Sequence, residues 1–276
     1  MTALIATLAS GLFGTADFLG GLASRRDSAV VVTIRSQIAG GLVLLVASLI
    51  VPATVGRADI ALGVVAGVSG GIGVLALYAG LATGRMSVVA PVTAALTGTL
   101  PAAVDFIRGT QVAPLALSGI VLALAAVVIV SISGHDHSDG SARRALLFAV
   151  IAGVGFSGSL LSFASTAPTS GFWPTVAARI TSVTMLSILA VARGQGLALS
   201  GDALKPALWA GLFDGLATIS VITAIRLGPL AVASVLSSLY PVVTVLLARY
   251  ILEERLHGWQ RVGVVMALAA VVLAAL

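Results

Sequence analysis

The sequence predicts an all-α polytopic membrane protein with ten transmembrane helices, arranged as two inverted five-helix repeats. Three observations predict it: the composition, the long apolar runs and an internal duplication. Hydrophobic residues make up 59% of the chain and charged residues 9%, with a mean hydropathy of +1.14, whereas a soluble domain carries about 25% charged residues. So much apolar surface requires lipid as solvent, where only helices and closed barrels satisfy the backbone. The unbroken apolar runs favour helices, because barrel strands alternate apolar and polar residues.

The duplication is visible as the hexapeptide Ala-Leu-Ala-Ala-Val-Val, which occupies 123–128 and again 267–272. Compositional bias explains shared Ala and Val, but it does not place scarce arginines and glycines in register. The same offset of 144 residues, without a gap, pairs Gly11 with Gly155, Gly14 with Gly158, Arg35 with Arg179, Gly67 with Gly211, Gly71 with Gly215, Gly84 with Gly228 and Gly119 with Gly263. We therefore expect two copies of one unit, 1–132 and 145–276, joined by a polar linker at 133–144.

Each copy contains five apolar runs near the length of about 20 residues that a spanning helix needs. In the first copy we expect helices at 2–22, 29–51, 60–82, 87–107 and 114–132. In the second copy we expect them at 145–167, 173–192, 206–227, 230–250 and 258–276. Because five is odd, two tandem copies must enter the bilayer in opposite senses. Inverted repeats of this kind build many secondary transporters, whose binding site lies at the midplane between the repeats.

Glycines and prolines predict how the helices pack and bend. Gly63, Gly67 and Gly71 form a ridge of small residues that Gly211 and Gly215 repeat, and glycines at this spacing let helix backbones approach closely. A proline inside a helix removes a backbone hydrogen bond and kinks the helix. The prolines that we expect within helices, as moving hinges or as static kinks, are Pro91, Pro101 and, midway along 230–250, Pro241.

Four charged residues lie inside the predicted spans and more than three residues from either end, where charge is costly and is a functional hypothesis by default. Arg35 and Arg179 lie at matching depths in their predicted helices. Each could receive an anionic solute, pair with an acid, or serve as a structural residue whose side chain reaches the interface. Asp17 is placed to pair with Arg35, and the deeper Asp214 is the first candidate for proton coupling, with Asp17 the second. An inert, hydrogen-bonded role is the alternative for each acid. Neutral donors to a central cavity are expected from Tyr78, Thr93, Thr97 and Tyr240.

Several chemistries are not supported by the sequence. There is no Cys, no phosphate-binding glycine loop, and the His residues fall in predicted loops. The Gly-x-Ser-Gly stretch at 155–158 therefore lacks the histidine base that a serine nucleophile requires. We expect no enzyme, no metal and no cofactor. Arginines are scattered at the ends of apolar runs, which is typical of interfacial anchors and does not suggest nucleic-acid binding.

Particular motifs resemble a known family. They are Gly11 to Gly14 followed by Asp17-Phe-Leu-Gly-Gly21, and the run from Leu239-Tyr-Pro241 through Glu254 to Gln260 and Gly263. In these features, and over nearly its whole length, the chain resembles the EamA-like branch of the drug/metabolite transporter superfamily. The resemblance implies a central cavity and alternating access, and leaves the substrate open. Two departures are Phe13, where relatives commonly have Trp, and Thr110, which aligns with Glu254 in the first copy.

Charge distribution predicts the orientation. Loops that follow odd-numbered helices carry 10 Lys or Arg residues, and loops that follow even-numbered helices carry 3. The positive-inside rule then places both termini outside the cytoplasm in the cell membrane.

We therefore expect a proton-coupled secondary transporter that exports a small polar or amphipathic metabolite. Alternatives are an uptake carrier, a passive channel, or a non-transporting membrane scaffold or sensor. Its partners would be the lipid bilayer and a small-molecule substrate. The helices at 114–132 and 258–276 would support the bundle or form a homodimer face.

Overall fold

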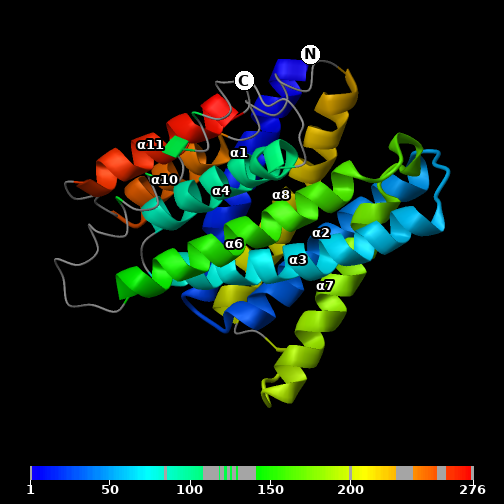
Figure 1. The fold of residues 1–276 in the computed structure, drawn as a ribbon. Coiled ribbons are helices and arrows are strands. Elements are labelled where there is room, and N and C mark those ends of the chain that lie inside the picture. The colour runs from blue at the N-terminus through cyan, green and yellow to red at the C-terminus, as the bar shows by residue number, and fades with distance from the viewer. Residues whose placement is uncertain are drawn as a thin grey trace.

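A computed structural model shows an entirely helical arrangement in the part of the chain that it describes (Figure 1). That part comprises residues 2–83, 86–107, 141–198, 201–227, 239–253 and 259–274, with isolated residues at 118, 121–122, 125 and 129. The helices are α1 Thr2–Ser24, α2 Ala29–Ile50, α3 Arg57–Ala82, α4 Met86–Ile107, α6 Ser141–Ala164, α7 Trp173–Ala192, α8 Gly201–Leu227, α10 Tyr240–Ile251 and α11 Trp259–Ala274, with a short 3-10 turn, η1, at Pro168–Ser170.

Length and composition identify a multi-pass membrane protein. Within the described residues, six helices are long and apolar enough to cross a bilayer: α1, α2, α3, α6, α7 and α8. Most predicted bounds agree with the structure to within a few residues. The bounds of α8 were wrong, because this helix begins at Gly201 and carries Pro206 inside it. Apart from isolated residues, the helix expected at 114–132 lies outside the described residues, as does the first part of the helix expected at 230–250. Of the linker expected at 133–144, residues 133–140 also lie outside; the prediction was wrong for 141–144, which form the first turn of α6.

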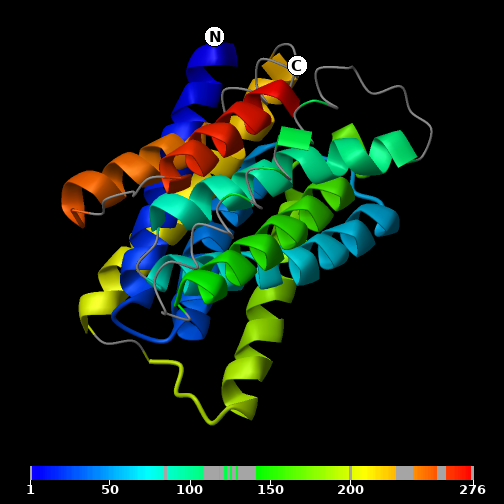
Figure 2. The same cartoon turned by 60° about the vertical axis from the view of Figure 1, so that its left-hand side comes forward.

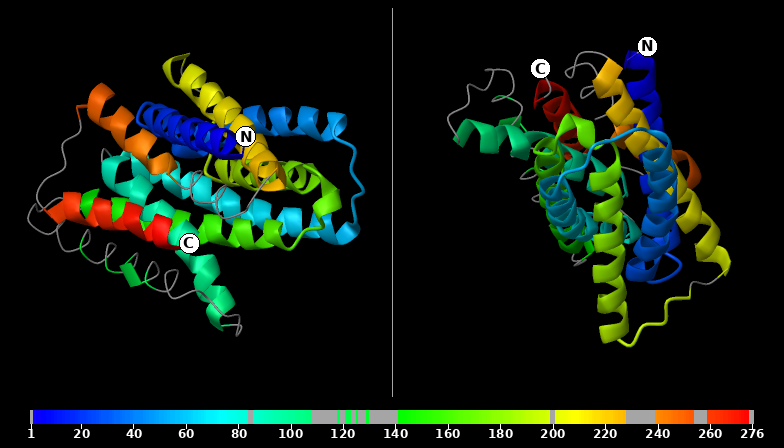
Figure 3. Two further views of the ribbon diagram at one scale, coloured as in Figure 1. Left: turned by 90° about the horizontal axis from the view of Figure 1, so that it is seen from above. Right: turned by 90° about the vertical axis from the view of Figure 1, so that its right-hand side faces the viewer.

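The described helices form a closed ring. Going round it, neighbours in contact are α4, α6, α3, α7, α2, α8, α1 and α10, and α10 packs against α4 to complete the circle. The last helix, α11, lies outside the ring against α4, at one side of the bundle (Figure 2 and Figure 3). The main contact across the ring is between α1 and α3, and weaker contacts join α3 to α4, α2 to α3, and α1 to both α2 and α4. Helices of both sequence halves therefore alternate around a common centre.

Hydrogen bonds between loops show how the two halves meet at each end. At one end, here end A, the loop after α1 contacts the loop after α7: Ser28 Oγ lies 3.4 Å from Gln195 Oε1, and Arg26 donates to the Asp202 carbonyl. At the opposite end, end B, the loop after α2 contacts the loop after α6 through Thr54 N–H, which donates to the Thr169 carbonyl at 2.9 Å. Since α2 runs from end A to end B and α7 from end B to end A, these two helices are antiparallel.

The carboxylate of Asp59 strengthens the contact at end B. It lies in the first turn of α3, is almost fully buried, and accepts the N–H of Gly56 at 2.9 Å and that of Ala167 at 2.7 Å. A carboxylate in the first turn of a helix is favoured by the helix dipole. One side chain therefore begins α3 and joins the two loops.

The glycine ridges make the close helix contacts that the sequence predicts. A Cβ atom added to Gly67 would collide with the Ala178 carbonyl on α7, and one added to Gly211 would collide with the Ser36 carbonyl on α2. Only glycine allows backbones this close. The same kind of contact therefore joins α3 to α7 and α8 to α2.

Of the predicted hinge prolines, one has a different position. Pro241 does not lie midway along a helix: it occupies the first turn of α10, where a proline fits because its missing N–H would have no partner inside the helix. Pro91 is buried within α4. Pro101 also belongs to α4, but its side chain is outside the described part.

Candidate functional site

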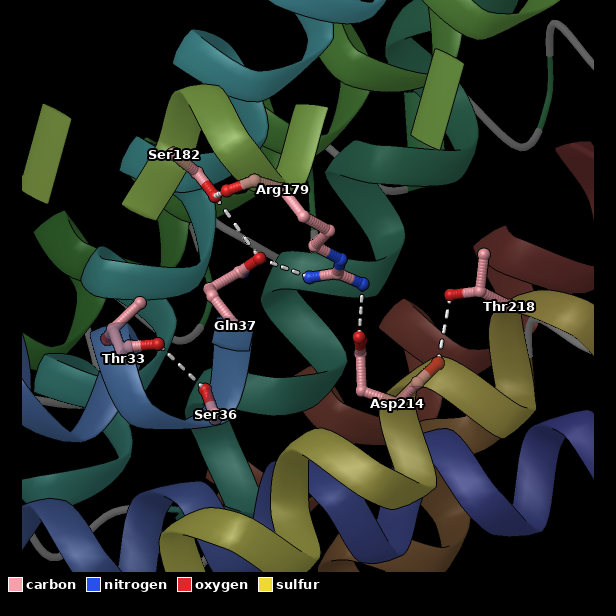
Figure 4. A network of polar contacts seen from close by, with 7 residues as sticks. All are labelled: Thr33, Ser36, Gln37, Arg179, Ser182, Asp214 and Thr218. Atoms are coloured by element: carbon pink, nitrogen blue, oxygen red, sulfur yellow. Dashed lines mark hydrogen bonds and ion pairs between the residues drawn. The ribbon is translucent and has the colours of Figure 1, made fainter. Parts of the chain in front are cut away.

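The most prominent polar feature is an ion pair between two membrane-spanning helices. Arg179, two turns into α7, donates through Nη2 to Asp214 Oδ2, midway along α8 (Figure 4). Both side chains are partly accessible, at 17% for Arg179 and 24% for Asp214. Charged groups inside a bilayer are rare, face the protein interior or a water-filled cavity, and pair with one another. We therefore take this pair as the centre of the candidate functional site.

A glutamine from the other half of the chain completes the network. Gln37 on α2 is buried, and its Oε1 accepts Arg179 Nη1 and, at 3.2 Å, the hydroxyl of Ser182 on α7. Arg179 thus has one terminal nitrogen on a carboxylate and the other on an amide oxygen. Because both donors are fixed, the guanidinium has a defined orientation between α2 and α8.

Two further predicted residues lie beside this network. Tyr78 on α3 is buried, and its hydroxyl lies within interaction range of Ser36, Asp17, Asp214 and Arg179. No hydrogen bond of the Asp17 carboxyl is found within the described residues. The site therefore brings together two acids, one guanidinium and a phenol.

The expected ion pair between Asp17 and Arg35 is wrong. Arg35 Nη2 donates instead to the Leu197 carbonyl in the loop after α7, at 2.7 Å, and its Nε is buried without a partner. The reason is the packing of α1, which lies mainly against α8, α10 and α3 and only weakly against α2. Asp17 consequently faces the region of Asp214.

The remaining predicted donors have local contacts. Thr93 donates to the Ala149 carbonyl at 3.3 Å and ties α4 to α6, and Thr97 donates to the Thr93 carbonyl within α4 at 2.9 Å. Tyr240 packs edge-on against Phe13, with ring centres 6.3 Å apart. The structure thus connects Thr93, Thr97 and Tyr240 to helix packing rather than to the ion pair.

The serine of the Gly-x-Ser-Gly stretch has a similar local role. Ser157 donates to the carbonyls of Gly153 at 2.7 Å and Leu96 at 3.2 Å, which joins α6 to α4. Its hydroxyl is buried in this contact.

Sequence reasoning missed Gln37, Ser36 and Ser182. A signal for Gln37 was present, because an amide in the middle of an apolar span needs a partner inside the protein. The two serines carry no such signal, since a serine in a helix ordinarily donates to its own backbone, as Ser182 also does to the Arg179 carbonyl. In the part of the chain that the structure describes, no cluster of three His, Cys, Asp or Glu side chains is present that could hold a metal.

Comparison with known proteins gives the family. Residues 143–276 match the EamA-like transporter family. This second half of the chain belongs to the EamA-like transporter family, part of the drug/metabolite transporter superfamily. No curated protein matches the sequence.

Solved structures share the fold of this chain. Seventeen solved chains match it. One, titled "Crystal structure of protein", has a TM-score of 0.64 at 16% identity and covers 99% of this chain and 96% of its own. At this identity the match shows a common fold over the whole chain and carries no information about substrate.

Proposed function

We propose that this protein is a secondary carrier in the cell membrane that exports a small polar or amphipathic metabolite in exchange for protons. It works by alternating access between two inverted repeats, residues 1–132 and 145–276. The observation that carries the proposal is the Arg179–Asp214 ion pair at mid-membrane, which Gln37 of the other repeat completes.

The helix positions support inverted repeats. Adding 144 to the bounds of α3, 57 and 82, gives 201 and 226, and α8 spans 201–227; adding 144 to the bounds of α2, 29 and 50, gives 173 and 194, and α7 spans 173–192. Equivalent helices α2 and α7 run antiparallel, as an axis in the membrane plane requires and an axis along the membrane normal forbids. The helix ring also maps onto itself when the two halves are exchanged.

The charge of the site supports proton exchange. Asp17 and Asp214 contribute two negative charges and Arg179 one positive charge, so one negative charge remains when all three are ionised. A proton or the positive group of a solute neutralises it, and the two can then compete for the same carboxylates. Competition of this kind couples proton entry to solute exit.

The experiment is a flux measurement in proteoliposomes. A thermal-shift screen of metabolites on purified protein first identifies a ligand. Asp214→Asn is then expected to abolish flux of that ligand driven by a pH gradient, because it removes one exchangeable carboxylate at the ion pair.

The matched control is Asp202→Asn, the same substitution at the exposed start of the same helix, which should transport normally. Unchanged gradient-driven flux in Asp214→Asn would exclude Asp214 as the coupling group and direct attention to Asp17. Lack of saturable counterflow in the unmodified protein would identify a passive channel.

A further inference from the structure

The two equivalent arginines hold different partners, which gives the molecule a directional asymmetry. Arg35 on α2 donates to the Leu197 carbonyl and so ties its helix to the loop after α7 at end A. Arg179, its counterpart on α7, makes no such bond and holds Asp214 and Gln37. Two copies of one unit thus differ in where one arginine points.

The packing of the helices has the same asymmetry. Near end A, α1 crosses the ring to α3: a Cβ atom on Gly21 would lie 2.6 Å from Leu81 Cβ, and one on Gly20 would overlap the Tyr78 ring. The equivalent pair near end B is α6 and α8, and these helices are not packed together in this way among the described residues. End A, where the arginine bond to the loop is made, is therefore the more tightly packed end.

An acceptor for Arg179 is already present at end B. The 144-residue offset pairs Leu197 with Ala53, in the loop after α2. This loop lies beside the start of α7: a Cβ atom on Gly171 would be 2.9 Å from Ala53 Cβ, and the Thr54 N–H bonds to the Thr169 carbonyl. Arg179 and Arg35 lie at the same depth in their helices, so the Ala53 carbonyl is, by position, the counterpart of the Leu197 carbonyl that Arg35 contacts.

We propose that Arg179 is a two-position switch, which holds Asp214 in the present conformation and bonds to the Ala53 carbonyl when Asp214 is neutralised. In the second position α6 packs against α8 and end B closes, while Arg35 leaves Leu197 and end A opens. The inference rests on the proposed inverted-repeat carrier. The switch gives the ion pair a mechanical role, because a guanidinium that loses its carboxylate partner in an apolar interior must bond to another acceptor.

The sequence explains why only one arginine is controlled in this way. The position equivalent to Asp214 is Gly70, and the position equivalent to Gln37 is Thr181. Arg35 therefore has no acid to hold it at mid-membrane. The charge state of one carboxylate can then select between the two ends.

The test uses the absence of cysteine from the natural chain. One cysteine pair, Ser28→Cys with Gln195→Cys, reports on end A, and a second, Ala164→Cys with Ile222→Cys, reports on the α6–α8 approach at end B. The second pair is equivalent to Gly20 and Tyr78, which touch at end A. Each pair is treated with a short thiol cross-linker in membranes, in otherwise unchanged protein and with Asp214→Asn.

Asp214→Asn should raise cross-linking at end B and lower it at end A, each by roughly tenfold, the factor that a hydrogen bond to a charged group contributes. Adding Arg179→Gln should cancel both changes, because the switch itself is then missing. Asp202→Asn is the matched control and should change neither. If Asp214→Asn does not fold, Asp214→Gly, which copies Gly70, replaces it.

The proposal is overturned if neutralising Asp214 leaves both cross-links unchanged, or if Arg179→Gln does not alter its effect. These outcomes are separate from failure of the proposed function. Normal cross-link switching without gradient-driven flux would contradict proton-coupled transport and leave the switch intact. Normal flux with unchanged cross-links would contradict the switch alone.

Discussion

Arg35 and Arg179 occupy equivalent positions in the two halves of the chain, yet one contacts a loop carbonyl and the other a partly buried carboxylate. The scaffolds around them are alike, because glycines at the same offset pack α3 against α7 and α8 against α2. The halves differ in the polar groups opposite each arginine, where Asp214 corresponds to Gly70. The comparison teaches that the glycine packing of the two halves can be alike while their polar groups at the centre differ.

The largest loss of stability is expected at the glycines that both halves use to pack their helices together. Gly67→Val and Gly211→Val should each destabilise the protein by about 3 kcal/mol or more, because each new side chain meets a helix backbone that cannot move aside. Thermal unfolding in detergent, followed by size-exclusion chromatography, measures the loss. Gly11→Ala is the control, since a Cβ atom there meets nothing within 4 Å. If only one of the two valine variants were destabilised, the packing of the halves would not be equivalent.

A smaller effect separates the two arginines. Arg179→Ala should cost about 3 kcal/mol, because it leaves Asp214 without its cation. Arg35→Ala should cost about 1–2 kcal/mol, the value of one charged hydrogen bond to a carbonyl. Denaturant unfolding of both variants measures the difference.

A double-mutant cycle checks the cause. Asp214→Asn should recover part of the stability that Arg179→Ala loses, since no buried charge then remains unpaired. It should recover nothing in Arg35→Ala. Equal recovery in both variants would show that the ion pair does not explain the difference.

The smallest loss of stability is expected when the side-chain amide of Gln37 is removed. Gln37→Leu should destabilise by about 1–2 kcal/mol, because it removes the acceptor for Arg179 Nη1 and Ser182 Oγ. Thr181→Val, at the equivalent position of the second half, should change stability less, since Thr181 donates only to the Ala177 carbonyl of its own helix. A larger loss for Thr181→Val would contradict the asymmetry proposed for the centre.

Part of the site could be predicted from the sequence. Arg179 and Asp214 stand out as charges inside apolar spans, and the structure joins them. Their pairing was not predicted, and the predicted pair of Asp17 with Arg35 was wrong because contact between helices follows from packing and not from proximity in the chain. The proposed site roles of all these residues stay predictions: Asp17, Arg35, Tyr78, Thr93, Thr97, Arg179, Asp214 and Tyr240.

By itself, the sequence determined the membrane class, most of the helix bounds and the 144-residue register, because apolar run length and repeated glycines are local properties of the chain. Only the tertiary structure decided which polar groups meet. Arg179 lies 142 residues from Gln37 and 35 from Asp214, and their contact depends on where α2, α7 and α8 cross. A charged side chain inside the protein pairs with whichever polar group the helix packing brings next to it. The sequence identifies the charged residue, but it does not determine where the helices cross.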